Sequence, residues 1–295
     1  MNPPECQSGA WLTPQAECLL KAANGRRRDV NPNCCLWQAS GAIDGLDREL
    51  YPLLPNVYRA LKTQGVTIPG MDRLKGMYRY TWSKNQRLVQ QIAPLFQALG
   101  DSAIDAVTMG DMALALGYYR DLGRRPIFRV DILIRPDQAA AAVTLMEGIG
   151  WIMRAGAGQA DGHRDTAGSF EHPSGVSCTL LTKPIGLRND AIDEVWNAAV
   201  SLQSRSLRLR VPAPTDQLWE VCAQGALSGP GRSPLWLADA LVILSGHEKE
   251  IDWNRIGSIG RTGETGASTD DALRYVRDTL RAPIPHSRLS KQSFA

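Results

Sequence analysis

The chain has 295 residues, of which 43% are hydrophobic and 21% are charged, as expected for a soluble globular protein with a large core. Its formal net charge of +3 is too small to indicate nucleic-acid binding, and no segment approaches the roughly 18 uninterrupted apolar residues of a membrane span. The start of the chain lacks a secretory pattern and its six cysteines have irregular spacings, so we expect a cytoplasmic protein without a membrane partner.

The first hundred residues are predicted to be mainly helical. Apolar residues recur at three- and four-residue spacing over Ala16–Ala23, Tyr51–Lys62 and Lys84–Leu99. Thr13-Pro14 has the form of a helix start, and proline-containing loops separate these segments. The sequence therefore predicts an N-terminal helical region over residues 1–100.

Residues 101–188 change to a mixed pattern. A short apolar run over Ala103–Met109 ends in Gly110, as in a strand that enters a tight turn, and a helical pattern follows. Apolar side chains alternate with other residues from Phe128 to Ile134, which predicts a strand. An alanine-rich helix follows Pro136, and a hairpin with its turn at Ser174-Gly175 is expected afterwards.

The last part, residues 189–295, is predicted to be helical again. Helices are expected over Asp190–Leu202, from Thr215 onward, over Pro234–Leu244 and from Asp252, whereas Arg261–Thr269 is expected to form a mobile loop. The tail after Pro283 is expected to fray. Together these patterns predict an α+β protein in which a small mixed sheet with its own helices is flanked by two helical regions.

The order of short motifs in this arrangement is informative. Met109-Gly110 is followed by Tyr118-Tyr119 and Arg125-Pro126, and then by a strand containing Arg129, Asp131 and Leu133. Asp216-Gln217-Leu218 and Trp236-Leu237-Ala238-Asp239 come later in the chain. In order and spacing, this set resembles the bacterial uncharacterised nucleotidyltransferase family, a branch of the DNA polymerase β superfamily.

The resemblance implies a particular chemistry. In that superfamily, two acids at alternate positions of one strand and a third on a neighbouring strand hold Mg²⁺ against a nucleoside triphosphate. Alternate strand residues point to the same face, roughly 6.6 Å apart along the backbone. The glycine turn lets backbone amides approach the phosphates. A nucleoside triphosphate and Mg²⁺ are thus the ligands that the resemblance implies for this chain.

This chain departs from the family pattern at the acids. Arg129 stands in place of the first acid, which leaves Asp131 alone, and the third acid would fall near Thr179, where no carboxylate exists. The lysine before the turn glycine is Met109, and Asp111 follows the glycine. Mg²⁺ usually needs two or more carboxylates to offset its dehydration, so two-metal nucleotidyl transfer is not expected.

The remaining polar residues of the motif have alternative roles. Arg129 and Asp131 form either a structural ion pair or a site in which Arg129 clamps a phosphate or carboxylate in place of the metal. Asp111 is either an N-cap or dipole partner of the following helix, or a relocated metal ligand that acts with Asp131. Arg125 either contacts phosphate or is a solvated loop residue.

Two functions follow from these alternatives. The first is a degenerate nucleotidyltransferase, a pseudoenzyme that binds a nucleotide, another phosphate-bearing small molecule or a protein partner in the old nucleotide cleft. Gly110, Arg125 and Arg129 would then contact the ligand. The second is an active, metal-dependent transferase that moves a nucleoside monophosphate onto a small molecule or protein through Asp131 and Asp111.

Overall fold

A computed structural model describes residues 12–24, 43–154, 165–204, 207–228, 233–262 and 265–285. Most of the predicted frayed tail lies outside these ranges. Within them, no helix is long and apolar enough to cross a membrane.

The N-terminal helices are α1 (Pro14–Asn24), α2 (Leu54–Gln64) and the long α3 (Met71–Asp101). Two short 3₁₀ turns, η1 (Ile43–Gly45) and η2 (Arg48–Leu53), lie between α1 and α2. All three predicted helical segments are therefore helical, and α3 begins well before the predicted Lys84. Its buried residues recur at three- to four-residue intervals from Thr81 to Leu99, and Leu74 lies seven residues before Thr81, so one stripe of the helix faces the interior.

The middle of the chain forms the mixed sheet. Its strands are β1 (Ala106–Met109), β2 (Val130–Ile134), β3 (Ile152–Met153), β4 (Asp165–Glu171) and β5 (Ser177–Lys183), in the order β1-β2-β5-β4-β3. β2 and β5 are parallel, and the other neighbours are antiparallel. Short helices α4 (Gly110–Ala113), η3 (Leu114–Tyr118) and η4 (Pro136–Gln138), together with α5 (Ala139–Gly148), connect these strands. This confirms the predicted α+β class with its strand, alanine-rich helix and hairpin.

The C-terminal part contains both helices and a second, two-stranded sheet. Its elements are η6 (Asn189–Ala191), α6 (Ile192–Ala198), β6 (Val200–Ser204), β7 (Leu207–Val211), α7 (Pro214–Ser228), α8 (Leu235–His247), η7 (Glu248–Glu250), α9 (Trp253–Thr262) and α10 (Gly266–Leu280). The predicted helix starts at Thr215, Pro234 and Asp252 each lie within two residues of an observed start.

Two predictions for this part were wrong. The helix expected over Asp190–Leu202 ends at Ala198, because the following residues pair with β7 as an antiparallel hairpin. Apolar and polar residues alternate strictly over Leu207–Val211, which is the period of a strand. The loop expected over Arg261–Thr269 is also wrong for most of its length, since α9 extends to Thr262 and α10 begins at Gly266.

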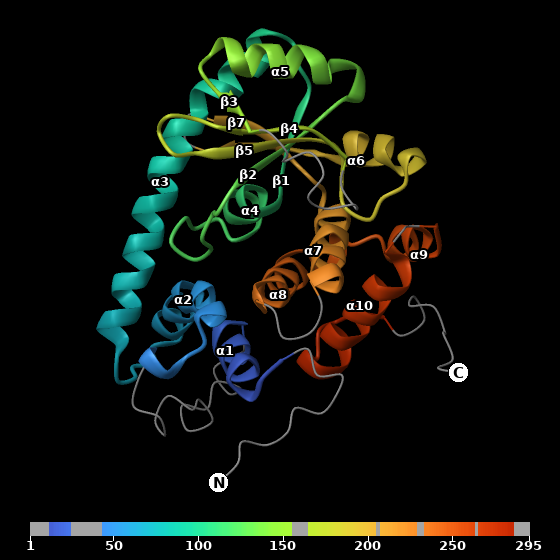
Figure 1. Ribbon diagram of the computed structural model, residues 1–295. Coiled ribbons are helices and arrows are strands. Elements are labelled where there is room, and N and C mark those ends of the chain that lie inside the picture. The colour runs from blue at the N-terminus through green and yellow to red at the C-terminus, as the bar shows by residue number, and fades with distance from the viewer. Residues whose placement is uncertain are drawn as a thin grey trace.

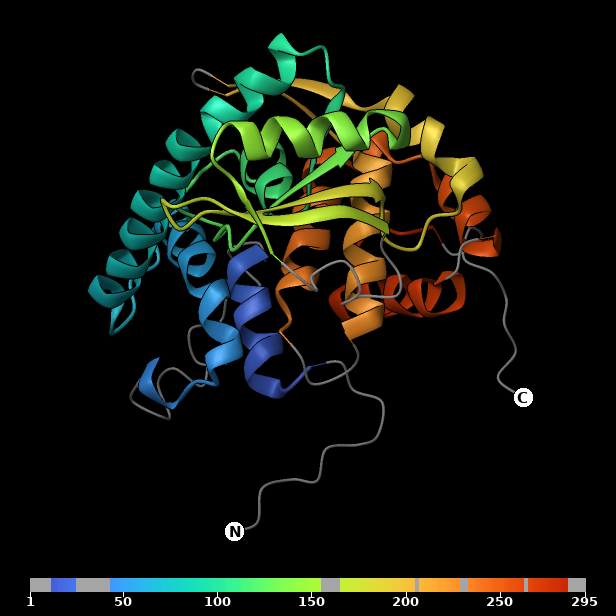
Figure 2. The same cartoon turned by 45° about the horizontal axis from the view of Figure 1, so that its top comes forward.

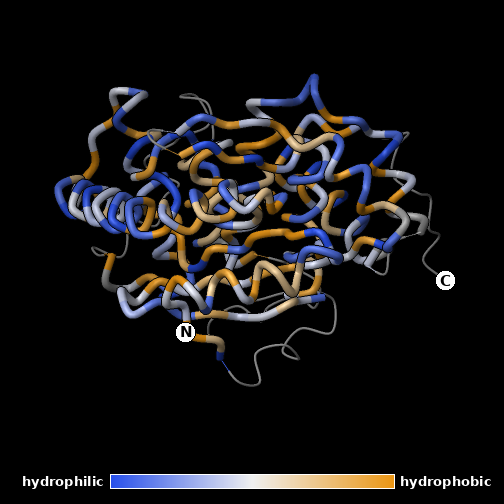
Figure 3. The backbone as a smooth tube through the Cα atoms, turned by 90° about the horizontal axis from the view of Figure 1, so that it is seen from above, coloured by the Kyte–Doolittle hydropathy of each residue, from blue (hydrophilic) through white to orange (hydrophobic). Residues whose placement is uncertain are grey.

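The sheet separates two apolar cores. Figure 1 shows α5 over one face of the five-stranded sheet and α4, α7 and α8 on the other side, and Figure 2 shows the same layers with α5 brought forward. Ile132 and Leu180 pack with α5 and the second half of α3, whereas Leu133 and Leu181 pack toward α7 and α8. Figure 3 shows the apolar segments crossing the centre of the molecule. β2 is consequently buried on both faces.

The core below the sheet joins the two ends of the chain. Side chains of α1 and α2 share this core with those of α7, α8 and α10. The N-terminal and C-terminal helices are therefore packed as one layer against the sheet. Asp131 lies on the same face of β2 as Leu133, so its side chain faces this helical layer.

Candidate functional site

The turn after β1 brings Gly110 against Asp131. Met109 and Asp131 are register partners in the β1–β2 ladder, and Gly110 follows with a φ of 56°. A Cβ added to Gly110 would lie 3.2 Å from Oδ2 of Asp131 and would have the positive φ that side chains rarely tolerate. Glycine is therefore needed here both for the turn and for the close approach to the carboxylate.

Arg129 and Asp131 form an ion pair. Nε of Arg129 lies 3.0 Å from Oδ2 of Asp131, and the side chains differ greatly in exposure, 42% for Arg129 and 2% for Asp131. The predicted contact is therefore present. The guanidinium faces the solvent side of the pair, and the carboxylate lies in the interior.

The neighbouring strand supplies no acid at this level. Asp131 is the register partner of Thr179 in β5, as the sequence predicted for the third-acid position. The adjacent Cys178 is buried, and burial together with the charge of Asp131 raises the pKa of its thiol well above the ordinary value. The thiol is thus an apolar packing group.

The side chain of Asp111 binds the loop that leads into β2. Its Oδ1 lies 2.8 Å from Nη1 of Arg125, and its Oδ2 accepts a hydrogen bond of 2.9 Å from the backbone N–H of Phe128. The N-cap of α4 is Met109, without a side-chain cap bond, so the N-cap interpretation of Asp111 was wrong. The carboxylate instead fixes the course of the loop.

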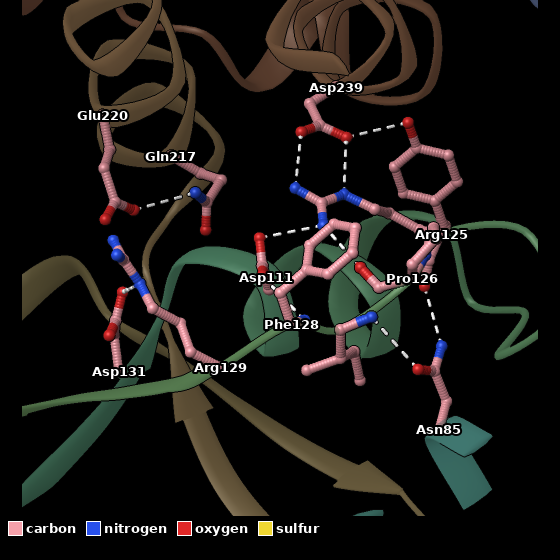
Figure 4. A network of polar contacts seen from close by, with 12 residues as sticks. Asn85, Asp111, Arg125, Pro126, Phe128, Arg129, Asp131, Gln217, Glu220 and Asp239 are labelled. Atoms are coloured by element: carbon pink, nitrogen blue, oxygen red, sulfur yellow. Dashed lines mark hydrogen bonds and ion pairs between the residues drawn. The ribbon is translucent and has the colours of Figure 1, made fainter. Parts of the chain in front are cut away.

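Arg125 is the buried centre of this network, which Figure 4 shows. It donates from Nε and Nη2 to the two oxygens of Asp239 on α8, at 3.1 and 3.0 Å, in the bidentate arrangement that is strongest for this pair. The hydroxyl of Tyr119 donates to Asp239 at 2.8 Å. The expectation that Arg125 is a solvated loop residue was wrong, because a carboxylate from a helix more than 100 residues later compensates its charge.

Electrostatics follow from this burial. Burial alone lowers the pKa of Arg125, but the carboxylates of Asp239 and Asp111 outweigh it and raise the pKa well above its ordinary value. Burial raises the pKa of Asp239, and this rise is opposed by the charge of Arg125 and by the hydrogen bonds from Arg125 and Tyr119. Burial and the nearby Asp239 raise the pKa of Tyr119 in turn. Arg125 is therefore charged at every physiological pH and holds the loop against α8.

Asn85 on α3 fixes the same loop from the other side. Its Nδ2 donates to the carbonyl oxygens of Leu122 and Arg125, each at 2.7 Å, and its Oδ1 accepts from the N–H of Ile127 at 3.0 Å. Sequence reasoning did not identify this residue. The signal that could have found it is a polar side chain within the apolar stripe of α3, where only a fully hydrogen-bonded group is tolerated.

Two further polar residues come from α7. Nε2 of Gln217 donates to Oε2 of Glu220 at 2.9 Å, and both side chains are buried. Figure 4 shows them facing the guanidinium of Arg129, on the opposite side from Asp131. The sequence predicted the start of this helix but gave neither residue a role. A charged residue within an apolar helix was the available signal.

The cluster as a whole contains the carboxylates of Asp111, Asp131, Glu220 and Asp239 and the guanidiniums of Arg125 and Arg129. The sequence predicted only the contact of Arg129 with Asp131, because nothing in it places the acids of α7 and α8 beside them. In the described part of the chain, no three acidic, histidine or cysteine side chains are arranged to share a metal ion. Both cleft acids of the motif are instead paired with arginines.

A mixed sheet with a glycine turn, an arginine-proline loop and an acid on the central strand, covered by C-terminal helices, defines a protein of the nucleotidyltransferase-like α+β class. A family model described as "Uncharacterised nucleotidyltransferase" matches residues 51–281, and the chain belongs to this family. No curated protein matches the chain. Among solved structures, an antigenic nucleotidyltransferase-like protein from Paracoccidioides brasiliensis is similar at 16% identity with a TM-score of 0.46, covering 70% of this chain and 97% of that one.

Proposed function

We propose that this member of the nucleotidyltransferase family binds a phosphate-bearing small molecule where the glycine turn, Arg129 and α7 meet, without transferring a nucleotide. One observation carries the proposal. The two acids that would serve a metal are already paired, Asp131 with Arg129 at 3.0 Å and Asp111 with Arg125 at 2.8 Å.

The donor set does not suit Mg²⁺. A magnesium ion needs carboxylates that can replace part of its tightly held water shell, and the side chain of Asp131 is only 2% exposed. A cation entering beside Arg129 would also meet a fixed positive charge. Two like charges about 4 Å apart repel by about 4 kcal/mol at an effective dielectric constant near 20, so the guanidinium opposes the ion, whereas Glu220 on its other side attracts it.

The same residues suit an anion with a planar ring. Arg129 is 42% exposed, and guanidinium groups bind phosphate through paired hydrogen bonds. Phe128, which is 57% exposed, lies beside Asp111 and Arg125, and its backbone is fixed by Asp111. An exposed phenyl ring one residue before Arg129 offers a stacking surface for a nucleobase. A protein partner remains the other occupant that the sequence leaves open.

The second candidate function is metal-dependent nucleotidyl transfer through Asp131 and Asp111. The position of Glu220 favours it, because this residue brings a further carboxylate to the Arg129 side of the cleft. If Arg129 turned away on nucleotide binding, Asp131 and Glu220 would face one another. This function requires the conversion of an ion pair into a metal site during the reaction.

Calorimetric titration with ATP, with and without Mg²⁺, separates the two candidates when it is combined with transfer of label from α-³²P-ATP. We expect binding that does not depend on Mg²⁺, that weakens about tenfold or more in Arg129→Ala, and that gives no labelled product. Arg154→Ala, which removes an exposed arginine from a surface pair with Glu171, is the matched control. Metal-dependent labelling of any acceptor, lost in Asp131→Asn, would refute the proposal in favour of the active enzyme.

A further inference from the structure

A second cavity lies apart from the cleft. It has a volume of about 840 Å³ and is lined by residues of α2, α3, η3, the loop after η3 and the end of β6. None of the five cleft residues predicted from the sequence is among the described residues that line it. Its volume falls within the roughly 300–1,000 Å³ of sites that bind small organic molecules.

The wall of this cavity is positively charged. Arg59, Arg120 and Arg124 line it, and Asp121 is the one acid among its described lining residues. Asp121 is already used three times: Oδ2 contacts Nε of Arg59 at 3.2 Å, and Oδ1 accepts hydrogen bonds from the Tyr78 hydroxyl at 2.8 Å and from the N–H of Gly123 at 2.9 Å. The acid therefore compensates Arg59 and leaves two guanidiniums.

In the described part of the chain, the hydrogen bonds of Arg120 and Arg124 go to neutral groups. Nε of Arg124 donates to Oδ1 of Asn56 at 2.8 Å, and its guanidinium lies 5.1 Å from the centre of the Tyr119 ring. Nε of Arg120 donates to the carbonyl oxygen of Gly117 at 3.0 Å. Burial lowers the pKa of Arg124, and the nearby Tyr119 and Asp121 oppose this effect only in part. An anion in the cavity would supply the missing compensation.

The backbone at Arg120 adds an independent observation. Its φ of 52° is in the left-handed region, which is strained for a residue with a side chain. Such conformations persist where surrounding structure enforces them and are frequent at ligand sites. Here the conformation directs the start of the arginine loop along the cavity wall.

Trp82 supplies an aromatic surface at the same place. It projects from α3, lines the cavity and is 42% exposed, which is unusual for a tryptophan of a folded protein. Indole rings stack on planar ligands and bind cations on their faces, and the arginine-rich wall excludes a cationic ligand. A planar, negatively charged molecule is the class that satisfies both features.

From this combination we infer that the cavity is a second ligand site, which binds a nucleoside phosphate with its phosphate at Arg120 and Arg124 and its ring on Trp82. The inference does not depend on the function proposed for the cleft. The two sites share a chemical class of ligand. Tyr119 lines the cavity and also donates to Asp239 of the other network, so the variants below leave Tyr119 unchanged.

Calorimetric titration with ADP tests the site, with adenosine and inorganic pyrophosphate as the two halves of the ligand. Arg120→Asn removes the guanidinium while retaining a residue that tolerates a positive φ, and Trp82→Ala removes the ring. Each is expected to weaken ADP binding about tenfold or more. Arg87→Asn and Tyr80→Ala change exposed residues of α3 that do not line the cavity, and should bind ADP as the unchanged protein does.

The outcomes are distinct. The two cavity substitutions are compared in the Arg129→Ala background, so that the site at Arg129 does not contribute. ADP affinity that is retained in Arg129→Ala and lost on adding Arg120→Asn or Trp82→Ala supports the cavity site. ADP binding that is absent in Arg129→Ala, or that the two cavity substitutions leave unchanged in this background, would overturn it. Adenosine binding as tightly as ADP would overturn the role of the arginines, and pyrophosphate binding as tightly as ADP would overturn that of Trp82. Circular dichroism of each variant establishes that it is folded.

Discussion

Replacing Asp239 by asparagine should destabilise the protein strongly although it changes one atom. Asp239 is 2% exposed and receives two hydrogen bonds from Arg125, itself 4% exposed. Removing one partner of a buried ion pair typically costs roughly 3–5 kcal/mol, because the remaining charge is left in a poor solvent. Asp111 still compensates part of the charge of Arg125 in the variant, so we expect a loss of about 3 kcal/mol.

Urea denaturation followed by circular dichroism measures this loss. Domains are typically stable by roughly 5–15 kcal/mol, so Asp239→Asn should remain folded in buffer and unfold at a lower urea concentration with an unchanged slope. Glu171→Gln is the matched control, since it makes the same chemical change in an exposed pair with Arg154 and should cost at most about 1 kcal/mol. Equal effects of the two substitutions would refute the argument that the buried pair anchors the loop.

Three further predictions address the site and the core. The Arg129→Asp substitution places a second carboxylate two residues before Asp131. In calorimetry, this variant should bind Mn²⁺ at least about tenfold more tightly than the Arg129→Asn variant does. Equal binding by the two variants would show that Arg129 does not keep the metal out. Burial raises the pKa of Asp216 to about 6 against the opposing effect of Arg255, so ionising it disfavours the folded state. Stability relative to Asp216→Asn should therefore fall by about 3 kcal/mol as the pH rises from about 4 to above 6, and a constant difference in urea titrations would contradict this. Gly110→Ala should lower the free energy of unfolding by about 1–2 kcal/mol in the same assay, because the φ of Gly110 is 56°. Gly76→Ala changes an open position in the interior of α3 and should raise the free energy of unfolding by roughly 0.5–1 kcal/mol. An unchanged stability of Gly110→Ala would contradict the argument that this turn is constrained.

Much of the fold was predictable because local periodicity decides it. The alternation around Asp131 and the turn glycines at Gly110 and Gly175 place strands whose partners are close in sequence. The hairpin of β6 and β7 was missed because a short amphipathic segment after α6 fits a helical period about as well as a strand period. Pairing with β7, a tertiary effect, decided between them.

The site was predictable only where its residues share one strand. Arg129 and Asp131 are two positions apart, so strand geometry alone brings them together. Asp239 reaches Arg125 across 114 residues, and Asn85 reaches it across 40. No rule of spacing gives such contacts, since the packing of α3 and α8 against the loop determines them. The sequence therefore predicts which residues the loop contributes to the site, but not which side chains they contact.

The shared core of the first and last helices has a consequence for synthesis of the chain. Leu19 and Leu20 of α1 are buried in the core that α8 completes, yet α8 begins about 210 residues after α1 ends. At translation rates of roughly 5–20 residues per second, the apolar stripe of α1 leaves the ribosome about 10–40 s before α8, one of the helices that cover it. In nascent chains of this protein, the part of that stripe which α8 covers in the native fold therefore stays exposed during this interval.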